Sequence, residues 1–391
     1  MQPQDVAGVL VGEVHPVNVS KTRQELSRLW DEAIIKFGTD RMRLSTLNLV
    51  TVLTGPDELP CIGEDLRSLC SHYPARVFAV VLDPEGTGEM AGWYSVNCNG
   101  SQVYQEQLTL HLPGETERQL PSLLAPLYHG DQPVFLWWRG RPGFAHPLWE
   151  RLADQADRIV VDTSHGSDLL GELNRQVRDP YHQELAFSDL EWTRQARWRN
   201  LLASLYDRPD AGEHLKKVSR LEIGFVPGPE RAESAPLYMA GWLASRLGWS
   251  VEKPLEDGKA IFRSGAGRAI EFVLQNEEGP DVLHNRLLYV RLDATPVGCC
   301  YGVYRKPENP RVYVSQVSGE ETVHNTAMPS GFVATTTLLR GAPKSAESDV
   351  FMPFAEQLNL IAAELEVFTR QPLFERSLAA AAEILGAGVT R

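Results

Sequence analysis

The sequence predicts an α/β protein. We expect an N-terminal mixed, mostly parallel sheet flanked by helices, followed by a second α/β (α+β) domain with an antiparallel strand set and C-terminal helices. Apolar runs alternate with amphipathic helices in the first half, turn-bounded strands follow one another in the second, and two helical patterns close the chain. A length of 391 residues favours two domains, which we place at 20–185 and 186–391, where apolar periodicity lapses.

The first domain alternates helices with apolar strands. The run VFAVVL at Val77–Leu82 is typical of a strand buried on both faces, as in a helix-covered sheet. The other expected strands are Leu47–Leu53, Gly92–Val96, Gln107–Leu112, Val134–Trp138 and Arg158–Asp162. The expected helices run from after Ser20 to near Gly38, over Glu64–Cys70 and Thr116–Leu127, through Leu148 and Leu152, and onward from near Ser164 or Ser167.

The second domain begins with helices and continues with strands. Trp198, Leu201, Leu202 and Leu205 share one face of a helix expected over Leu190–Tyr206. After it we expect a strand at Leu221–Val226, a helix at Ser234–Leu247 stopped by Gly248, and antiparallel strands between Ala260 and Leu338. Apolar stripes from Phe354 to Phe368 and from Phe374 to Leu385 predict the two closing helices.

Charge and cysteine content restrict the partners and the compartment. A formal net charge of -13 opposes nucleic acid and anionic membrane surfaces, so neither is an expected partner. Met1–Val19 holds no Lys or Arg, unlike a signal peptide, and no apolar run approaches the ~20 residues that span a bilayer. Five cysteines without a C-x-x-C pair favour a reducing compartment. We therefore predict a cytoplasmic protein.

The sequence lacks the motifs that usually mark an active site. There is no G-x-G-x-x-G, no G-x-x-x-x-G-K, no G-x-S-x-G and no pair of histidines at H-x-x-x-H spacing. We predict no enzyme activity, no cofactor and no metal site. Asp and Glu are plentiful, and one sequence does not show which of them meet, so a carboxylate mechanism stays open.

One aromatic and arginine cluster lies at the end of an expected central strand. Trp137, Trp138 and Arg139 follow the apolar residues of Val134–Trp138. In an open α/β sheet the carboxyl ends of the strands bind ligands, which makes this a candidate site for a partner or small molecule. The alternative is that one ring packs in the core while the other covers the sheet edge.

A second cluster, Trp192, Arg194 and Arg199, lies on the helix that opens the second domain. Trp and Arg are enriched at protein interfaces, although a salt-bridged internal helix explains them equally well. The strand end at Asp162, Thr163 and Ser164 is a candidate anion site, because free N–H groups at a helix start hold anions. A plain helix cap is the alternative there.

An ordered series of segments resembles one family, the glucose-6-phosphate dehydrogenase assembly proteins known as OpcA. Their order and spacing cover about residues 20 to 250. Tyr104 stands where we expect a Cys before a Glu-Gln pair, and Thr163 stands where we expect a Ser. The matching segments are Thr39–Arg43 leading into Leu47–Val50, Pro74–Val77, Glu106–Gln107, Asp131–Trp138, Ala156–Thr163, Asp189–Arg194 running into Trp198–Arg199, and Ala240–Trp249.

The resemblance implies a non-catalytic protein that binds glucose-6-phosphate dehydrogenase in the oxidative pentose phosphate pathway and promotes its assembly or activates it allosterically. A sugar-phosphate or nucleotide-binding enzyme or sensor at the strand ends near Trp138 and Asp162 is the competing hypothesis, and an inert structural subunit is a third. Large aromatic and arginine residues are the expected partner contacts: Arg41, Arg43, Trp137, Trp138, Arg139, Trp192, Arg194 and Arg199.

Overall fold

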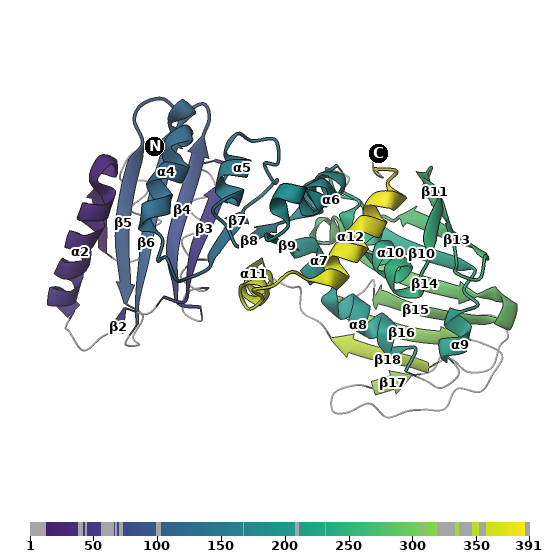
Figure 1. Cartoon of the computed structure of the whole chain (residues 1–391). Coiled ribbons are helices and arrows are strands. Elements are labelled where there is room, and N and C mark those ends of the chain that lie inside the picture. The colour runs from purple at the N-terminus through teal and green to yellow at the C-terminus, as the bar shows by residue number, and fades with distance from the viewer. Residues whose placement is uncertain are drawn as a thin grey trace. The chain divides into compact units, whose positions relative to one another are not determined.

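The chain forms two compact units, which Figure 1 draws with their helices and strands. Unit 1 consists of Met1–Asp162, Asp179–Leu190 and Glu356–Arg370, and unit 2 of Thr163–Arg178, Glu191–Ala355 and Gln371–Arg391. The chain thus leaves one unit for the other after residues 162, 178, 190, 355 and 370. The computed structural model describes residues 13–37, 42–43, 45–55, 66, 69, 73–98, 103–166, 168–207, 211–230, 232–306, 309–318, 333–335, 346–351 and 357–387.

The sheet of unit 1 is mixed and mostly parallel, which confirms the predicted fold class. Its strands follow the order β1-β5-β6-β4-β3-β7-β8-β9, with β2 beside β6. Neighbours from β6 through β9 run parallel, and the antiparallel pairs are β1 with β5 and β5 with β6. The strands are β1 Glu13–Val17, β2 Met42–Arg43, β3 Leu47–Leu53, β4 Ala75–Asp83, β5 Ala91–Cys98, β6 Val103–Pro113, β7 Val134–Trp138, β8 Arg158–Val161 and β9 Ala186–Asp189.

Helices cover both faces of this sheet. Because successive side chains in a strand point to opposite faces, β7 sends Trp137 and Trp138 into different layers. Trp137 packs in a cluster with Leu360, Ile361 and Leu365 of α11 (Gln357–Leu365). On the other face α5 (Leu148–Ala153) and α4 (Leu120–Leu124) lie in front of the strands in Figure 1. The helix α2 (Thr22–Phe37) contacts the antiparallel edge, β1 and β5.

A buried ion pair holds α11 on unit 1. Arg158 on β8 is fully buried, and its Nη2 lies 2.9 Å from Oε2 of Glu364 on α11. The hydroxyl of Ser188 on β9 contacts both side chains, and Arg158 also donates to the carbonyl of Thr369 at 3.0 Å. The buried charges of Arg158 and Glu364 need these hydrogen bonds and each other, because a buried charge without a partner is strongly destabilising.

The sheet of unit 2 is antiparallel except for one parallel pair, β10 with β13. Its described strands follow the order β11-β12-β13-β10-β14-β15-β16-β18-β17. They are β10 Arg220–Val226, β11 Ser250–Glu256, β12 Lys259–Arg263, β13 Ala269–Asn276, β14 Arg286–Ala294, β15 Cys299–Lys306, β16 Asn309–Ser318, β17 Val333–Thr335 and β18 Ala346–Phe351.

Two long helices pack against each other on one face of this sheet, α10 (Ser234–Leu247) and α12 (Pro372–Ile384). Their backbones approach closely at Gly241, where an added Cβ would lie 2.4 Å from the carbonyl oxygen of Ser377. Gly248 ends α10 with a φ of 64°, the left-handed conformation that favours glycine. The other helices begun or completed in unit 2 are α6 Leu169–Arg178, α7 Leu190–Arg194, α8 Ala196–Ser204 and α9 Ala211–Leu215. Each described helix is too short or too polar to span a lipid bilayer.

Most predicted elements are confirmed, and the strands at Leu47–Leu53 and Val134–Trp138 have the predicted bounds. The helix predicted over Thr116–Leu127 is instead a short α4 between two 3-10 turns, because Pro121 and Pro126 interrupt it. The helix predicted over Leu190–Tyr206 is divided at Gln195 into α7 and α8. Of the short helix expected at Glu64–Cys70, only Leu66 and Leu69 lie among the described residues, and both are helical.

Phe368 was expected in the core stripe of its helix, but α11 ends before it and its side chain is 55% exposed. Its ring still meets Phe135 edge to face, with centroids 5.6 Å apart. The division of the sequence into domains at residues 185 and 186 stays a prediction, since the compact units interleave along the chain.

Candidate functional site

The aromatic residues predicted at the central strand end lie inside unit 1. Trp137 and Trp138 are each 1% exposed. The ring of Trp138 meets Trp149 at 5.6 Å, and the guanidinium of Arg139, which is half-buried, lies 5.5 Å from the Trp137 ring. Arg139 also donates its backbone N–H to the carbonyl of Val52, which continues the sheet by one residue. Both rings pack in this structure, and their contact with a partner stays a prediction.

The second cluster also packs within its own unit. Trp192 is 5% exposed, and its ring lies near Tyr238 and Phe374. Arg199 places its guanidinium 3.5 Å from the centre of the Trp192 ring and donates to the Trp192 carbonyl at 2.7 Å. This close cation–π contact joins α8 to α7 across the break at Gln195.

Arg194 is turned toward a buried carboxylate. It contacts Glu191, which also lies 3.6 Å from Arg286 and accepts a hydrogen bond from Gln195 at 2.9 Å. The side chain of Glu191 is only 2% exposed, so it depends on these cations. Arg194 therefore has a structural role here, and its contact with a partner stays a prediction.

The remaining predicted residues are distributed over several elements. Arg41 lies outside the described residues, and only the backbone of Arg43, in β2, is described. Asp162 and Thr163 are buried and Ser164 is half-buried. The carbonyl of Thr163 accepts from the Ser234 hydroxyl at 2.8 Å, and that of Ser164 accepts from the Asn285 amide at 3.2 Å. These contacts fix the turn, while its binding of an anion stays a prediction.

Sequence reasoning missed an extended set of interacting polar side chains, which lies on one face of the unit 2 sheet. On β10, Leu221, Ile223 and Phe225 are fully buried, whereas Arg220 and Glu222, which alternate with them, point to the opposite face. The helix α10 contacts β10 and β14 of this sheet, and α12 contacts β11. We call the opposite side the open face: Arg220, Glu222, Lys259, Glu271, Tyr289, Arg291, Asp293, Cys300 and Tyr304, with Glu277 at the end of β13.

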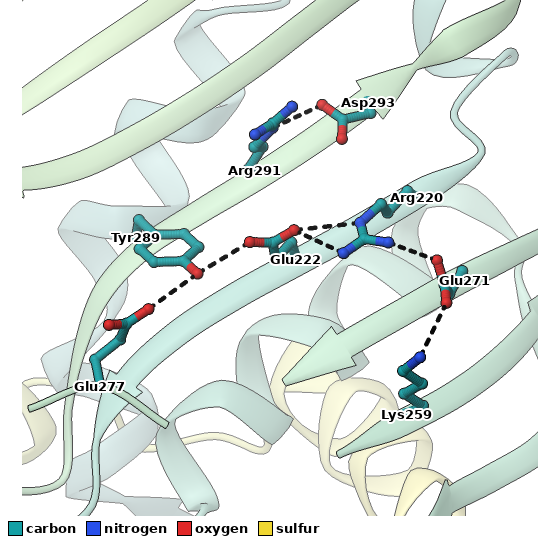
Figure 2. Close-up of polar contacts among 8 residues, drawn as sticks. All are labelled: Arg220, Glu222, Lys259, Glu271, Glu277, Tyr289, Arg291 and Asp293. Carbon is teal, nitrogen blue, oxygen red and sulfur yellow. Dashed lines mark hydrogen bonds and ion pairs between the residues drawn. The ribbon is translucent and has the colours of Figure 1, made fainter. Parts of the chain in front are cut away.

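The open face carries a connected series of polar contacts, shown in Figure 2. Arg220 donates to Glu271 on β13 at 2.7 Å and to Glu222 on its own strand at 3.0 and 3.2 Å. Lys259 on β12 lies 3.9 Å from Glu271. The Tyr289 hydroxyl on β14 lies 3.0 Å from Glu222. The strand register brings these side chains together, because Arg220 on β10 lies directly opposite Glu271 on the parallel strand β13.

A second part of the open face continues the series toward β15. The Tyr289 hydroxyl lies 3.3 Å from Glu277, and its ring stacks on that of Tyr304 with centroids 5.9 Å apart. Arg291 donates from Nε to Asp293 at 2.8 Å (Figure 2). The thiol of Cys300 lies beside both Arg291 and Asp293. Polar side chains of neighbouring strands are thus held in fixed relative positions.

The environment favours the protonated forms of Cys300, Tyr289, Tyr304 and Arg291. Burial, and then the Asp293 carboxylate, raises the pKa of the Cys300 thiol to about 12. Burial and the hydrogen bond to Glu222 raise the pKa of Tyr289, and burial raises that of Tyr304. Burial alone would lower the pKa of Arg291, but its bond to Asp293 raises it overall. Catalytic bases and nucleophiles usually show shifts in the opposite direction.

The described part of the chain offers two further polar sites. In unit 1, His111 Nε2 lies 2.8 Å from Asp83 at the carboxyl ends of β6 and β4. Near the 3-10 turn that follows β6, a hollow of ≈ 850 Å³ is lined by residues that include Glu89, Thr116, Arg118 and Ser122. Arg118 is already paired with Glu115 at 3.4 Å. Among the described residues, no three His, Cys, Asp or Glu side chains converge as metal ligands.

The fold defines a two-unit α/β protein in which one sheet is covered on both faces and the other displays a polar face. Residues 67–178 match the family described as the glucose-6-phosphate dehydrogenase subunit N-terminal domain, and residues 185–378 match the corresponding C-terminal domain. Together these matches cover most of the chain. The protein therefore belongs to the OpcA family of glucose-6-phosphate dehydrogenase assembly proteins.

Two similar proteins carry the name "Putative OxPP cycle protein OpcA". The protein of Synechococcus elongatus is 26% identical to this chain, over 83% of this chain and 72% of its own length. The protein of Nostoc punctiforme is 27% identical, over 80% of this chain and 65% of its own length. Among solved structures, an NAD binding oxidoreductase from Klebsiella pneumoniae aligns with a TM-score of 0.45 at 10% identity, over 87% of this chain and 95% of that one. A structure described as a putative oxidoreductase from Thermotoga maritima aligns with a TM-score of 0.46 at 9% identity, over 87% of this chain and 96% of that one. Scores this low are too weak to transfer a cofactor or an activity.

Proposed function

We propose that this chain is a non-catalytic protein that binds glucose-6-phosphate dehydrogenase and promotes its assembly or activates it allosterically. It would act in the cytoplasm, in the oxidative pentose phosphate cycle. The observation that carries the proposal is the match of both halves of the chain to domains described as parts of a glucose-6-phosphate dehydrogenase subunit. The pKa shifts on the open face, which hold Cys300 and Tyr289 protonated, support a binding role over a catalytic one.

An activator of this kind works by binding two forms of its target enzyme with different affinities. It must bind the competent form of the dehydrogenase more tightly than the incompetent form, and the shift in population cannot exceed that difference in binding free energy. Positively charged side chains at the surface would supply part of the contact. Arg139 is the strongest candidate among the residues that the sequence suggested, since it is half-buried at a strand end while the tryptophans beside it are in the core.

The test is to mix the purified chain with its cognate dehydrogenase at micromolar concentration. We expect the two to co-elute in size-exclusion chromatography, and the dehydrogenase to change its kcat or its KM for glucose 6-phosphate. Arg139→Glu should weaken binding about 10-fold, as expected for reversing an interfacial charge. The control Lys21→Glu makes the same charge change at an exposed residue of unit 1. Separate elution with unchanged kinetics would refute the proposal, and equal effects of both variants would refute the role of Arg139.

A further inference from the structure

The open face has the composition of a protein interface. Tyr and Arg are the residues most often found at binding hot spots, together with Trp, and Tyr289, Tyr304, Arg220 and Arg291 occupy neighbouring positions on β10, β14 and β15. The side chains are neither buried nor fully free: Arg220 is 36% exposed, Arg291 38% and Glu271 37%. A surface held in place in this way loses little conformational entropy when a partner covers it.

Two glycines lie at the centre of the open face. Gly224 and Gly302 carry no side chain on this face, and the rings of Tyr289 and Tyr304 lie over them. An added Cβ on Gly224 would lie 2.2 Å from Tyr289, and one on Gly302 would lie 2.5 Å from Tyr304. The two stacked rings therefore lie close to the strands, which lets a second surface approach the sheet.

The charges of the open face favour one particular partner. The whole chain has a formal charge of -13, so two copies repel each other at most orientations. The open face, however, has nearly balanced charge, since three cations, Arg220, Lys259 and Arg291, alternate with the four carboxylates of Glu222, Glu271, Glu277 and Asp293. It is a part of this acidic chain where a second copy can approach without strong repulsion.

We propose that the open face is the contact surface between two copies of this chain related by a two-fold axis. In a two-fold interface the same patch serves both subunits, so residue i of one meets residue j of the other and the reverse. A patch of alternating signs is complementary to itself after such a rotation. Arg220 directs three of its five N–H groups at Glu222 and Glu271, so two remain for carboxylates of the second copy.

The available area agrees with a dimer. The five neighbouring strands β12, β13, β10, β14 and β15 carry the open face. At a spacing of ~4.8 Å between strands and ~3.3 Å per residue over about seven residues, they outline roughly 550 Å² per copy. Specific interfaces bury about 800 Å² per partner, and the flanking strands β11 and β16 extend the same sheet on either side.

The experiment is sedimentation equilibrium of the full chain between about 1 and 100 μM, a range that spans typical dimer affinities. We expect a dimer, which Arg220→Glu and Lys259→Glu should each weaken about 10-fold or more in Kd. Lys259 is 65% exposed on the sheet, so its reversal leaves the fold intact even if Arg220→Glu does not. The control Arg376→Glu makes the same charge change at an exposed residue of α12. Circular dichroism establishes that each variant is folded.

Three outcomes would overturn the proposal. The first is a wild-type chain that sediments as a monomer throughout, and the second is a dimer that the open-face variants weaken no more than the control does. The third is a chain whose self-association is unchanged while Arg220→Glu abolishes co-elution with the dehydrogenase, which would assign the open face to that enzyme. The inference does not rest on the proposed function, because the dehydrogenase is absent from the sedimentation measurement.

Discussion

The ring of Tyr289 lies against the backbone of Gly224, its cross-strand neighbour on β10. A methyl group at Gly224 would approach Tyr289 Cε1 to 2.2 Å, so the ring would have to leave Glu222 and Tyr304. We expect Gly224→Ala to lower the free energy of unfolding by about 1–3 kcal/mol, the usual cost of overpacking. The measurement is urea denaturation.

Gly265→Ala is the control, because an added Cβ there meets nothing within 4 Å. It should leave stability unchanged or raise it by up to about 1 kcal/mol, since alanine restricts the unfolded chain. Equal stabilities of the two variants would mean that Tyr289 moves aside without loss.

Arg158→Met should be among the most destabilising single changes in unit 1. The substitution removes the cation that Glu364 pairs with, and the Glu364 side chain is only 5% exposed. Removing one partner of a buried ion pair typically lowers the free energy of unfolding by about 3–5 kcal/mol. The double variant Arg158→Met with Glu364→Leu removes both charges and should be considerably more stable than Arg158→Met alone. Chemical denaturation of the single and double variants gives the coupling between the two residues.

Arg28→Met is the control for Arg158→Met, because it removes an arginine from an exposed rather than a buried ion pair. Arg28 bonds Glu25 and Glu32 on the surface of α2, and its side chain is 55% exposed. Exposed ion pairs contribute little, so no measurable loss is expected. If Arg158→Met behaved like Arg28→Met, the buried pair would not hold α11 in place.

Cys300 should resist alkylation in the folded protein. Burial and the neighbouring Asp293 raise the pKa of its thiol to about 12, so the reactive thiolate is scarce between pH 7 and 9. Peptide mapping after treatment with iodoacetamide measures its modification separately from the other cysteines. Asp293→Asn removes the carboxylate and should lower the pKa of the thiol and speed its labelling. Fast labelling of the wild-type thiol at pH 8 would contradict this environment.

The same shift has a consequence for stability at high pH. The thiol ionises near pH 9 in the unfolded chain and only near pH 12 in the folded one. Its protonated form therefore favours the folded state fully below about pH 9, and that contribution is lost as the pH rises from 9 toward 12. Cys300→Ser should show a shallower decline of unfolding free energy over this interval.

Gly241→Ala should separate α10 from α12. The added Cβ would lie 2.4 Å from the carbonyl oxygen of Ser377 and 2.8 Å from the amide nitrogen of Ala381, both backbone atoms of the facing helix. Backbone cannot turn aside as a side chain can, so we expect a loss of about 3 kcal/mol, at the upper end for overpacking. Thermal unfolding measures it.

The matched control is Gly212→Ala in α9, where an added Cβ meets nothing within 4 Å. Alanine is the better helix former, so this variant should gain up to about 1 kcal/mol. A similar gain at Gly241 would show that the two helices do not touch there.

The local pattern of apolar residues in the sequence predicted most strands and helices, but it did not predict which strands and side chains lie next to one another. The run VFLWW at Val134–Trp138 predicts a buried strand because all five residues are apolar. Alternation of charged and apolar residues in β10 could have indicated a polar face, but only the register shows that Arg220 lies opposite Glu271. Arg158 and Glu364 are 206 residues apart, and neither carries a local sign that it will be buried.

The buried pair also affects how the protein is made. Unit 1 includes Glu356–Arg370, so Arg158 gains the Glu364 carboxylate as its partner only after residue 364 has been synthesised. Domains commonly fold as they emerge from the ribosome, the N-terminal one first. Here the ion pair that completes the N-terminal sheet forms only after a helix synthesised some two hundred residues later, so we expect stable folding of unit 1 to follow the synthesis of α11.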